Sequence, residues 1–259
     1  MKYALALRLE GPLQAWATTR AGDTVPTELV PTLSGITGLL GAAVGVPCDE
    51  LSALRALQDR FALAVRIDRP GRTFFDFQTV RGMPPRAGAR PKDTVVSWRE
   101  YLADASFLAL CVSDEAAPLA PLLDALTQPR WTLALGRFAC APSRPILAAR
   151  ELLVAPTLHD LVGWVPRADR ATASELVLDA ALSFDPARFR AVRTRTVVDR
   201  LGPSGFVARR VLHVVDLHAK AARAQGDGDW FAVDDDVPAT PDTVDDWFAA
   251  VDDLQEVPR

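Results

Sequence analysis

The chain has few of the residues that bind metals or form disulfides: three cysteines and three histidines among 259 residues. Cys48, Cys111 and Cys140 are odd in number, far apart in sequence and without a C-x-x-C pair. This spacing argues against a zinc site or a disulfide framework and favours a reducing compartment. The histidines show no metal-ligand spacing with one another or with cysteine. We therefore predict no bound metal and no cofactor.

Long apolar runs are also absent, because no run reaches the roughly 18 residues that a membrane-spanning helix needs. The N-terminal stretch MKYALALRLE resembles a signal peptide in its apolar content, but Arg8 and Glu10 interrupt it. Its apolar residues alternate from Tyr3 to Leu9, which is typical of a β-strand. The sequence thus predicts a strand at residues 2–9, no contact with membranes and a cytoplasmic protein.

Charges of the two signs are unevenly distributed, so the net charge of −4 hides a contrast. Residues 224–259 contain eleven acidic residues and one basic residue, whereas the preceding part has a net charge of +6. Of the 29 basic residues, 26 are arginines, whose planar guanidinium suits phosphate recognition and base stacking. A basic body with an acidic tail is compatible with a nucleic-acid-binding protein. We expect residues 224–259 to form an acidic mobile tail.

The order of the predicted elements indicates an α+β fold. Up to residue 150 the order is β-α-β-β-α-β, as in a ferredoxin-like unit. The strands of this unit are expected at residues 2–9, 61–67, 105–112 and 132–137, and its helices at residues 30–46, 50–58 and 117–128. Residues 151–223 form a smaller β-rich part, in which two strands flank the turn Gly202-Pro203-Ser204-Gly205 as a β-hairpin.

The segment VPTLSGITGLLGAAVGV, residues 30–46, combines helical spacing of apolar residues with four glycines. Each glycine inside a helix costs about 1 kcal/mol relative to alanine. Thr32 or Ser34 can cap this helix, and its first-turn N–H groups would bind a phosphate. Small residues such as Gly35 would let a nucleic-acid backbone approach closely. An equally weighted alternative is that the glycines permit tight packing onto a sheet.

A second candidate site is the loop VRGMPPRAGARPKD at residues 80–93, which lies between aromatic residues. Arginines among aromatics suit single-stranded RNA, whose bases stack and whose phosphates pair with cations. The alternative is a solvated loop between two strands whose aromatic residues belong to the core. The basic residues of this loop are Arg81, Arg86, Arg90 and Lys92. A third, weaker candidate site is the segment LGRFACAPSRP, whose basic residues are Arg137 and Arg144.

Sequence motifs of catalysis are absent, since the chain has no G-x-S-x-G elbow, no H-E-x-x-H helix and no Walker loop. A metal-independent ribonuclease needs a general base near the reacting 2′-hydroxyl, usually histidine or a tuned lysine or tyrosine. The chain has three histidines, three lysines and two tyrosines. Because isolated histidines on strands are more often structural, we expect no catalytic residue and no enzyme activity.

Five motifs occur here in one order: LRLEGPLQAW, PTLSGITGLLGAAVG, DFQTV, SWREYLADASF and LGRFACAPSRP. In this order they resemble the CasD family, subunits of the type I-E CRISPR Cascade complex within the repeat-associated RNA-binding protein superfamily (RAMP). The resemblance is dense over residues 1–150 and looser in the C-terminal part. It implies a ferredoxin-like (RRM-like) N-terminal domain with a protruding thumb hairpin at about residues 74–98, plus a smaller β-rich C-terminal part.

The resemblance also implies a function: a non-catalytic subunit of a ribonucleoprotein complex in antiviral defense, which binds and caps the 5′ handle of the guide crRNA. The expected partners are this crRNA, the adjacent Cascade backbone subunit and the large subunit, and target DNA indirectly through the complex. The start of the glycine-rich helix belongs to the implied RNA surface. Besides the basic candidates above, the predicted RNA-binding residues are Gln14, Trp16, Arg20, Thr32, Ser34, Gly35 and Thr37.

Three positions depart from the motifs of the family. Leu33 and Phe138 stand where the family has basic residues, and Gln78 stands where it has a histidine. The remaining arginines and backbone N–H groups would have to bind the phosphates that those side chains contact.

Two alternatives stay open. The first is a metal-independent endoribonuclease that processes CRISPR repeat RNA, with His213, His218 or Lys220 as the general base. Cleavage of repeat RNA in the presence of a chelator would favour it. The second is an assembly scaffold whose contact with RNA is incidental, which handle-selective, salt-dependent binding would exclude.

Overall fold

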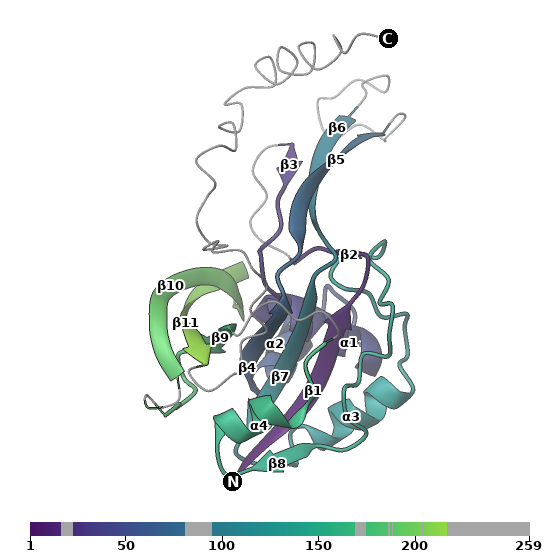
Figure 1. Cartoon of the computed structure of the whole chain (residues 1–259). Coiled ribbons are helices and arrows are strands. Elements are labelled where there is room, and N and C mark those ends of the chain that lie inside the picture. Colours follow the sequence, from purple (N-terminus) through teal and green to yellow (C-terminus); the bar gives the residue numbers. More distant parts are fainter. Residues whose placement is uncertain are drawn as a thin grey trace. The chain divides into compact units, whose positions relative to one another are not determined.

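The structure is a computed structural model that describes residues 1–16, 23–80, 95–168, 175–185, 187, 189–203 and 205–216. In this part the chain forms two β-sheets and four α-helices (Figure 1). The predicted acidic tail at residues 224–259 lies outside the described residues. None of the described helices is both long and apolar enough to cross a bilayer.

The larger sheet has seven strands in the order β10-β11-β9-β4-β7-β1-β8, and every neighbouring pair is antiparallel. Strand β7 lies between β4 and β1 and is buried at seven of eight positions, which explains its almost continuous apolar sequence SFLALCVS. The strands are β1 (Lys2–Glu10), β4 (Ala62–Arg69), β7 (Ser106–Ser113), β8 (Leu153–Ala155), β9 (Glu175–Asp179), β10 (Phe189–Gly202) and β11 (Gly205–Asp216).

Helices cover both faces of this sheet. Ala4 and Ala6 of β1 belong to a buried cluster with Leu158 and Leu161 of α4 (Leu158–Trp164), and their small side chains let α4 approach closely. Figure 1 shows α4 in front of the sheet, and α1 (Leu33–Val44) and α2 (Leu51–Gln58) behind it. Helix α3 (Ala120–Thr127) packs against α1. Because β1 side chains alternate, its leucines point to the face opposite α4.

The second sheet continues from two strands of the first. β5 (Arg72–Val80) follows β4, and β6 (Val95–Ala103) precedes β7; short strands β2 (Leu13–Gln14) and β3 (Thr24–Val25) pair with β6. The chain bends between the sheets at Gly71 and Asp104, whose φ angles are +79° and +57°. A Cβ atom on Gly71 would lie 2.6 Å from the Ala103 carbonyl oxygen, so the bend requires glycine there.

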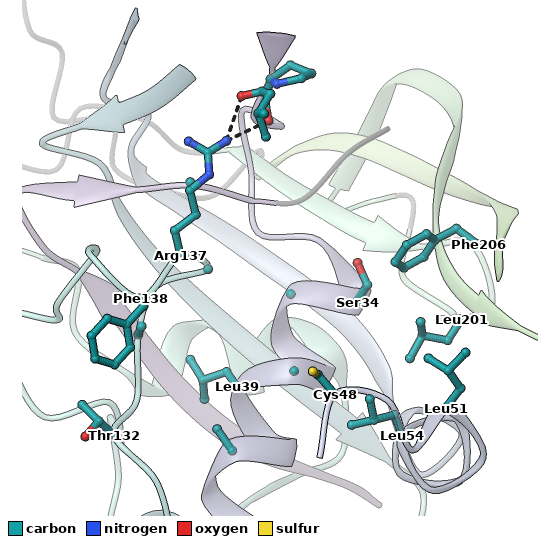
Figure 2. Close-up of a pocket in the computed structure, with 18 residues that line it drawn as sticks. Ser34, Leu39, Cys48, Leu51, Leu54, Thr132, Arg137, Phe138, Leu201 and Phe206 are labelled. Atoms are coloured by element: carbon teal, nitrogen blue, oxygen red, sulfur yellow. Dashed lines mark hydrogen bonds between the residues drawn. The ribbon is translucent and has the colours of Figure 1, made fainter. Parts of the chain in front are cut away.

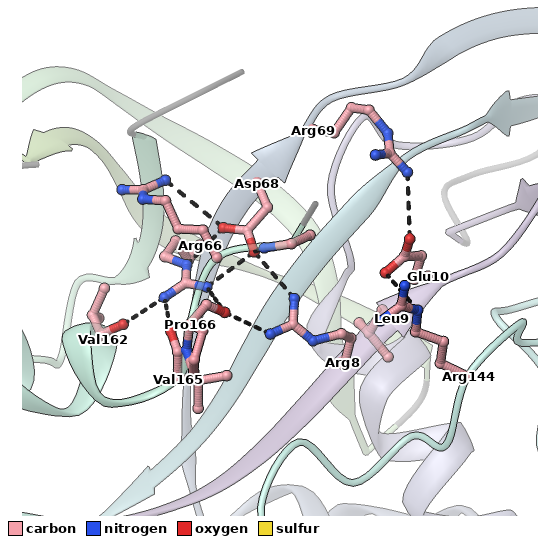
Figure 3. Close-up of polar contacts among 12 residues, drawn as sticks. Arg8, Leu9, Glu10, Arg66, Asp68, Arg69, Arg144, Val162, Val165 and Pro166 are labelled. Atoms are coloured by element: carbon pink, nitrogen blue, oxygen red, sulfur yellow. Dashed lines mark hydrogen bonds and ion pairs between the residues drawn. The ribbon is translucent and has the colours of Figure 1, made fainter. Parts of the chain in front are cut away.

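An arginine–carboxylate cluster on β4 fixes the end of α4 (Figure 3). The buried Arg66 guanidinium donates to the carbonyl oxygens of Val162 and Val165, both at 2.7 Å. These are carbonyls that the end of a helix leaves without intrahelical partners. Asp68 accepts from Arg66 at 2.7 and 2.9 Å and from Arg8 at 3.3 Å. Since pairing compensates the burial of these charges, we assign this cluster a structural role.

Most predicted elements are confirmed, including the strands at residues 2–9, 61–67 and 105–112 and the hairpin at residues 202–205. The strand predicted at residues 132–137 is wrong, because this segment is a loop. Gly136 has φ +92°, which an extended strand does not allow, and Leu135 N donates to Cys140 O within the loop. The predicted boundary near residue 150 stays a prediction, although β8 pairs with β1 and β9 pairs with β4.

Candidate nucleic-acid interface

The start of α1 is capped by protein atoms. Thr32 is the N-cap residue, and its Oγ1 accepts a hydrogen bond from Gly35 N at 3.1 Å. Leu33 N donates to the Asp199 carboxylate of β10 at 2.8 Å. Two of the N–H groups predicted to receive a phosphate are therefore already bonded within the protein. The phosphate contact predicted for the helix start stays a prediction, with fewer N–H groups left to make it.

The glycines of α1 have different roles. A Cβ atom on Gly35 would lie 2.8 Å from the Trp16 ring, and one on Gly41 would lie 2.7 Å from Leu54. Gly45 ends the helix in the left-handed conformation, with φ +87°. Gly35 and Gly41 thus pack closely against Trp16 and Leu54, not onto a strand of a sheet as the alternative predicted, and Gly45 serves the geometry of the helix end. At Gly38, in contrast, no described atom lies within 4 Å of the added Cβ, and the residue is exposed.

Replacing Gly38 with alanine should stabilise the protein by about 1 kcal/mol, because alanine loses less backbone entropy in a helix and meets no neighbour here. Urea unfolding monitored by circular dichroism would measure this as a higher midpoint. A lower midpoint would mean that another part of the chain covers this flank.

Four polar contacts fasten the β10–β11 hairpin to α1, to α2 and its end, and to the segment before α1. Asp199 binds Leu33 N and also accepts two hydrogen bonds from Arg209, at 2.7 and 2.9 Å. Gln58 of α2 exchanges hydrogen bonds with the backbone of Leu201, accepting at 2.9 Å and donating at 3.4 Å. The remaining two contacts are ion pairs, Arg195 with Glu28 and Arg200 with Asp59. The hairpin tip is thereby held next to α1 and α2.

The loop at residues 132–138 is fixed on the opposite side of α1. Ala15 N donates to Leu135 O at 3.0 Å, so this loop lies directly on the chain after β2. The Arg137 guanidinium donates to Glu100 O at 2.7 Å and to Val25 O at 2.8 Å, and it lies 4.6 Å from the centre of the Tyr101 ring. Arg137 therefore holds the loop in place, with both terminal nitrogens of its guanidinium donating to backbone carbonyl oxygens.

Between the hairpin tip and this loop lies a pocket of about 500 Å³, with the flank of α1 as its floor (Figure 2). Most of the residues that line it are apolar, and several of them are glycine or alanine. The lining residues are Ala15, Val25, Pro26, Ser34, Gly35, Gly38, Leu39, Ala42, Cys48, Leu51, Leu54, Thr132, Ala134, Gly136, Arg137, Phe138, Leu201 and Phe206. The pocket thus joins segments that are far apart in the sequence.

The structure brings three predicted residues, Ser34, Gly35 and Arg137, to this pocket. Three others, Gln14, Trp16 and Thr37, are fully buried. Their side chains have internal partners or neighbours and support the site rather than face it, which corrects their predicted contact with RNA.

The internal contacts of the buried residues explain their place in the motifs. Gln14 Nε2 donates to Leu9 O and Ala105 O, and its Oε1 accepts from Trp16 Nε1 at 3.1 Å. Thr37 Oγ1 donates to Leu33 O at 2.8 Å. Gln14 of β2 is therefore tied to β1 and to the residue that directly precedes β7.

The other predicted residues are not at the pocket or not described. Arg144 is exposed and lies 3.8 Å from the Glu10 carboxylate, away from the pocket lining. Thr32 caps α1 and is buried. Five further predicted residues lie outside the described part of the chain, namely Arg20, Arg81, Arg86, Arg90 and Lys92. Within the described ranges, no group of three or more histidine, cysteine or acidic side chains is arranged to hold a metal ion.

Sequence reasoning missed two aromatic residues of the pocket. The side chain of Phe138 is 86% exposed and that of Phe206 is 54% exposed. The signal for Phe138 was present, because a large apolar residue stands there at a motif position that is basic in the resembling family. No local signal marked Phe206, which directly follows the hairpin turn.

Cys48 provides a native chemical probe of the pocket. It is exposed, whereas Cys111 and Cys140 are buried, and burial raises the pKa of both buried thiols. We expect iodoacetamide to modify Cys48 alone in the folded protein near neutral pH, because the reagent attacks accessible thiolates. Intact-mass spectrometry should show a single adduct before unfolding and three after it. Several adducts on the folded protein would contradict the described burial.

Comparison with known proteins agrees with the motifs. The family model described as CRISPR-associated protein (Cas_Cas5) matches residues 4–216. The Escherichia coli K12 protein "CRISPR system Cascade subunit CasD" is 40% identical over 157 residues, which are 56% of this chain and 70% of that protein.

Two solved structures are also similar to the described fold. A chain of a "CRISPR RNA-guided surveillance complex" has 28% identity and a TM-score of 0.58, covering 82% of this chain and 89% of that one. A "Crystal structure of Cas protein" has 29% identity and a TM-score of 0.57, covering 82% and 95%. The chain therefore belongs to the Cas5 family of CRISPR-associated proteins, the assignment that its CasD-like motifs predicted.

Proposed function

We propose that this protein is a non-catalytic subunit of a type I-E CRISPR Cascade complex and that it binds and caps the 5′ handle of the guide crRNA. The observation that carries the proposal is the pocket, because it joins the CasD-like helix motif at Ser34 and Gly35 with the LGR motif at Gly136 and Arg137. The 40% identity of this chain to a protein named as a Cascade subunit supports the same function.

The order of the strands supports an RNA-binding fold of the ferredoxin-like type. Strands β1, β4, β7 and β8, together with α1 and α3, follow the β-α-β-β-α-β plan, and they lie in the sheet order β4-β7-β1-β8. We identify the thumb of the family with the hairpin of β5 and β6, which is inserted between β4 and β7. Strands β9 to β11 form the smaller β-rich part at one end of the sheet.

The character of the pocket suits single-stranded RNA. Glycine and alanine on the α1 flank let a backbone approach, and two exposed aromatic rings offer surfaces for unpaired bases. The +6 net charge of the chain before its acidic tail provides the long-range attraction to phosphates.

The partners in this proposal are the crRNA, the backbone and large subunits of Cascade, and target DNA through the complex. The names of the relative and of the similar surveillance-complex chain support this assembly. We place the complex in the cytoplasm, in keeping with three cysteines that are free thiols.

The alternative of an endoribonuclease finds less support at the pocket. Among the described residues that line it there is no histidine, lysine, tyrosine, aspartate or glutamate to act as a general base. His213 is 6% exposed and lies on β11, where its Nε2 is 2.9 Å from a Glu175 carboxylate oxygen. His218 and Lys220 lie outside the described residues.

Equilibrium binding of a labelled CRISPR repeat RNA bearing the 5′ handle, compared with a scrambled handle, tests the proposal. The reactions contain a chelator and are run afterwards on a denaturing gel. We expect tighter binding of the intact handle and no cleavage. Equal binding of both RNAs would favour an incidental contact, and cut RNA would favour the endoribonuclease.

Gly38→Glu tests in the same experiment whether the RNA lies on the α1 flank, and Gly163→Glu is its control. Both Gly38 of α1 and Gly163 of α4 are exposed helix glycines with no described atom within 4 Å of an added Cβ. A glutamate at Gly38 places a negative charge in the pocket and should weaken handle binding at least about tenfold, because it faces phosphates. Gly163→Glu, on the opposite face of the sheet, should leave binding unchanged.

A further inference from the structure

Two phenylalanine rings stand on opposite sides of the pocket in Figure 2, and both are exposed to solvent. Phe138 projects from the loop at residues 132–138, and Phe206 is the second residue of β11. Exposed fractions of 86% and 54% are unusual for phenylalanine, which is normally buried. Large exposed apolar side chains around a pocket are typical of a binding surface.

Both rings are carried by rigid backbone. Next to Phe138, Gly136 is pressed against Ala15, and the Arg137 guanidinium binds the carbonyl oxygens of Glu100 and Val25. Phe206 pairs with Leu201 across the hairpin, and Leu201 is itself bound by Gln58. The backbone on both sides of the pocket is thus held in place, which lowers the entropy that a ligand must remove on binding.

The surface between the rings has little polar chemistry of its own. It includes Gly35, Gly38 and Ala42 of the α1 flank beside the hydroxyl of Ser34, and both terminal nitrogens of the Arg137 guanidinium donate to carbonyl oxygens. A phosphate would find few donors here, whereas the flat apolar face of a base would find two aromatic rings and room beside small residues. At about 500 Å³, the pocket has the size of a small-ligand site.

We propose that Phe138 and Phe206 are stacking platforms for two unpaired bases of an RNA strand whose backbone crosses the α1 flank between them. This inference rests on the proposed function, since it assumes that the pocket receives the crRNA handle. It adds that the pocket holds the strand through base stacking, a contact that every base can make, so that selectivity for the handle comes from other contacts of the RNA.

The test combines protein variants with abasic positions in the RNA. The labelled repeat RNA is prepared with a single abasic site at each handle position in turn, and each RNA is titrated with wild-type protein and with Phe138→Ala or Phe206→Ala. We expect each variant to lose about tenfold in affinity, the loss typical of one base stack. The abasic site opposite each ring should cost about tenfold with wild-type protein and almost nothing with the matching variant.

Three further variants separate stacking from other effects. Phe138→Trp should keep wild-type affinity, whereas Phe138→Leu, which stays apolar but has no aromatic face, should bind like Phe138→Ala. Trp164→Ala removes another ring, 64% exposed on α4 across the sheet, and should change nothing. Because all these side chains are exposed, their loss leaves the core intact.

The outcomes distinguish the inference from the proposed function. If wild-type protein binds the intact handle selectively but the alanine variants bind it equally well, stacking is refuted while handle binding stands. Stacking is likewise refuted if every abasic site costs the same affinity with variant and wild-type protein. If wild-type protein does not select the handle, the proposed function fails, and the inference fails with it.

Discussion

Gly136→Ala should lower the free energy of unfolding more than any other glycine-to-alanine substitution among the residues that line the pocket. The φ angle of +92° already disfavours an L side chain, and an added Cβ would lie 1.6 Å from the Ala15 carbonyl oxygen. Left-handed backbone and overpacking against main chain together cost roughly 2–5 kcal/mol. Urea unfolding would measure this loss, and handle binding should fall with it because the loop bearing Phe138 is displaced.

Gly38→Ala is the matched control, since it adds the same methyl group at a position with helical geometry and no neighbour. The two variants should move the urea midpoint in opposite directions. An unchanged midpoint for Gly136→Ala would mean that the loop at residues 132–138 does not lie on Ala15 as described.

Replacing Asp199 with alanine should have the second large effect. The variant leaves Leu33 N without its carboxylate and leaves the guanidinium of Arg209, 9% exposed, with a single contact to Asp179 at 3.3 Å. Breaking a buried ion pair from one side costs about 3–5 kcal/mol. The hairpin tip that carries Phe206 loses its attachment to α1, so RNA affinity should fall as well.

Two other substitutions show whether the loss of stability in Asp199→Ala comes from its buried hydrogen bonds and ion pair. Asp199→Asn keeps an oxygen that can accept from Leu33 N, and it should lose clearly less stability than Asp199→Ala. Asp59→Ala removes the exposed ion pair with Arg200 near the same hairpin tip and should cost less than about 1 kcal/mol. Similar losses for Asp199→Ala and Asp59→Ala would refute the assignment of Asp199 as the main attachment.

The parts of the fold with local signals were predictable from sequence. Alternating residues identified β1, the apolar run identified β7, and glycines around a short turn identified the β10–β11 hairpin. Residues 132–137 have the apolar sequence TLALGR, which is also typical of a strand. The left-handed φ of Gly136 is set by contact with Ala15, far away in the sequence, and no local pattern reports it.

The site was predictable where a motif faces the solvent and not where it faces the core. Ser34, Gly35 and Arg137 line the pocket, and their contact with RNA stays a prediction, whereas Gln14 and Trp16 of an equally clear motif are fully buried. A motif therefore marks residues that build a site as well as residues that touch its ligand. Asp199 could not be found at all, because its bond to Leu33 N depends on the pairing of distant elements.

The most direct test of the central claim, that the pocket beside α1 receives the crRNA handle, is the alkylation rate of Cys48 with and without RNA. Cys48 lines the pocket, and it is the exposed one of the three cysteines. Repeat RNA with the intact 5′ handle should slow its reaction with iodoacetamide, and scrambled-handle RNA at the same concentration should not. An unchanged rate at RNA concentrations that a gel shift shows to be saturating would contradict the account, because the handle would then bind elsewhere.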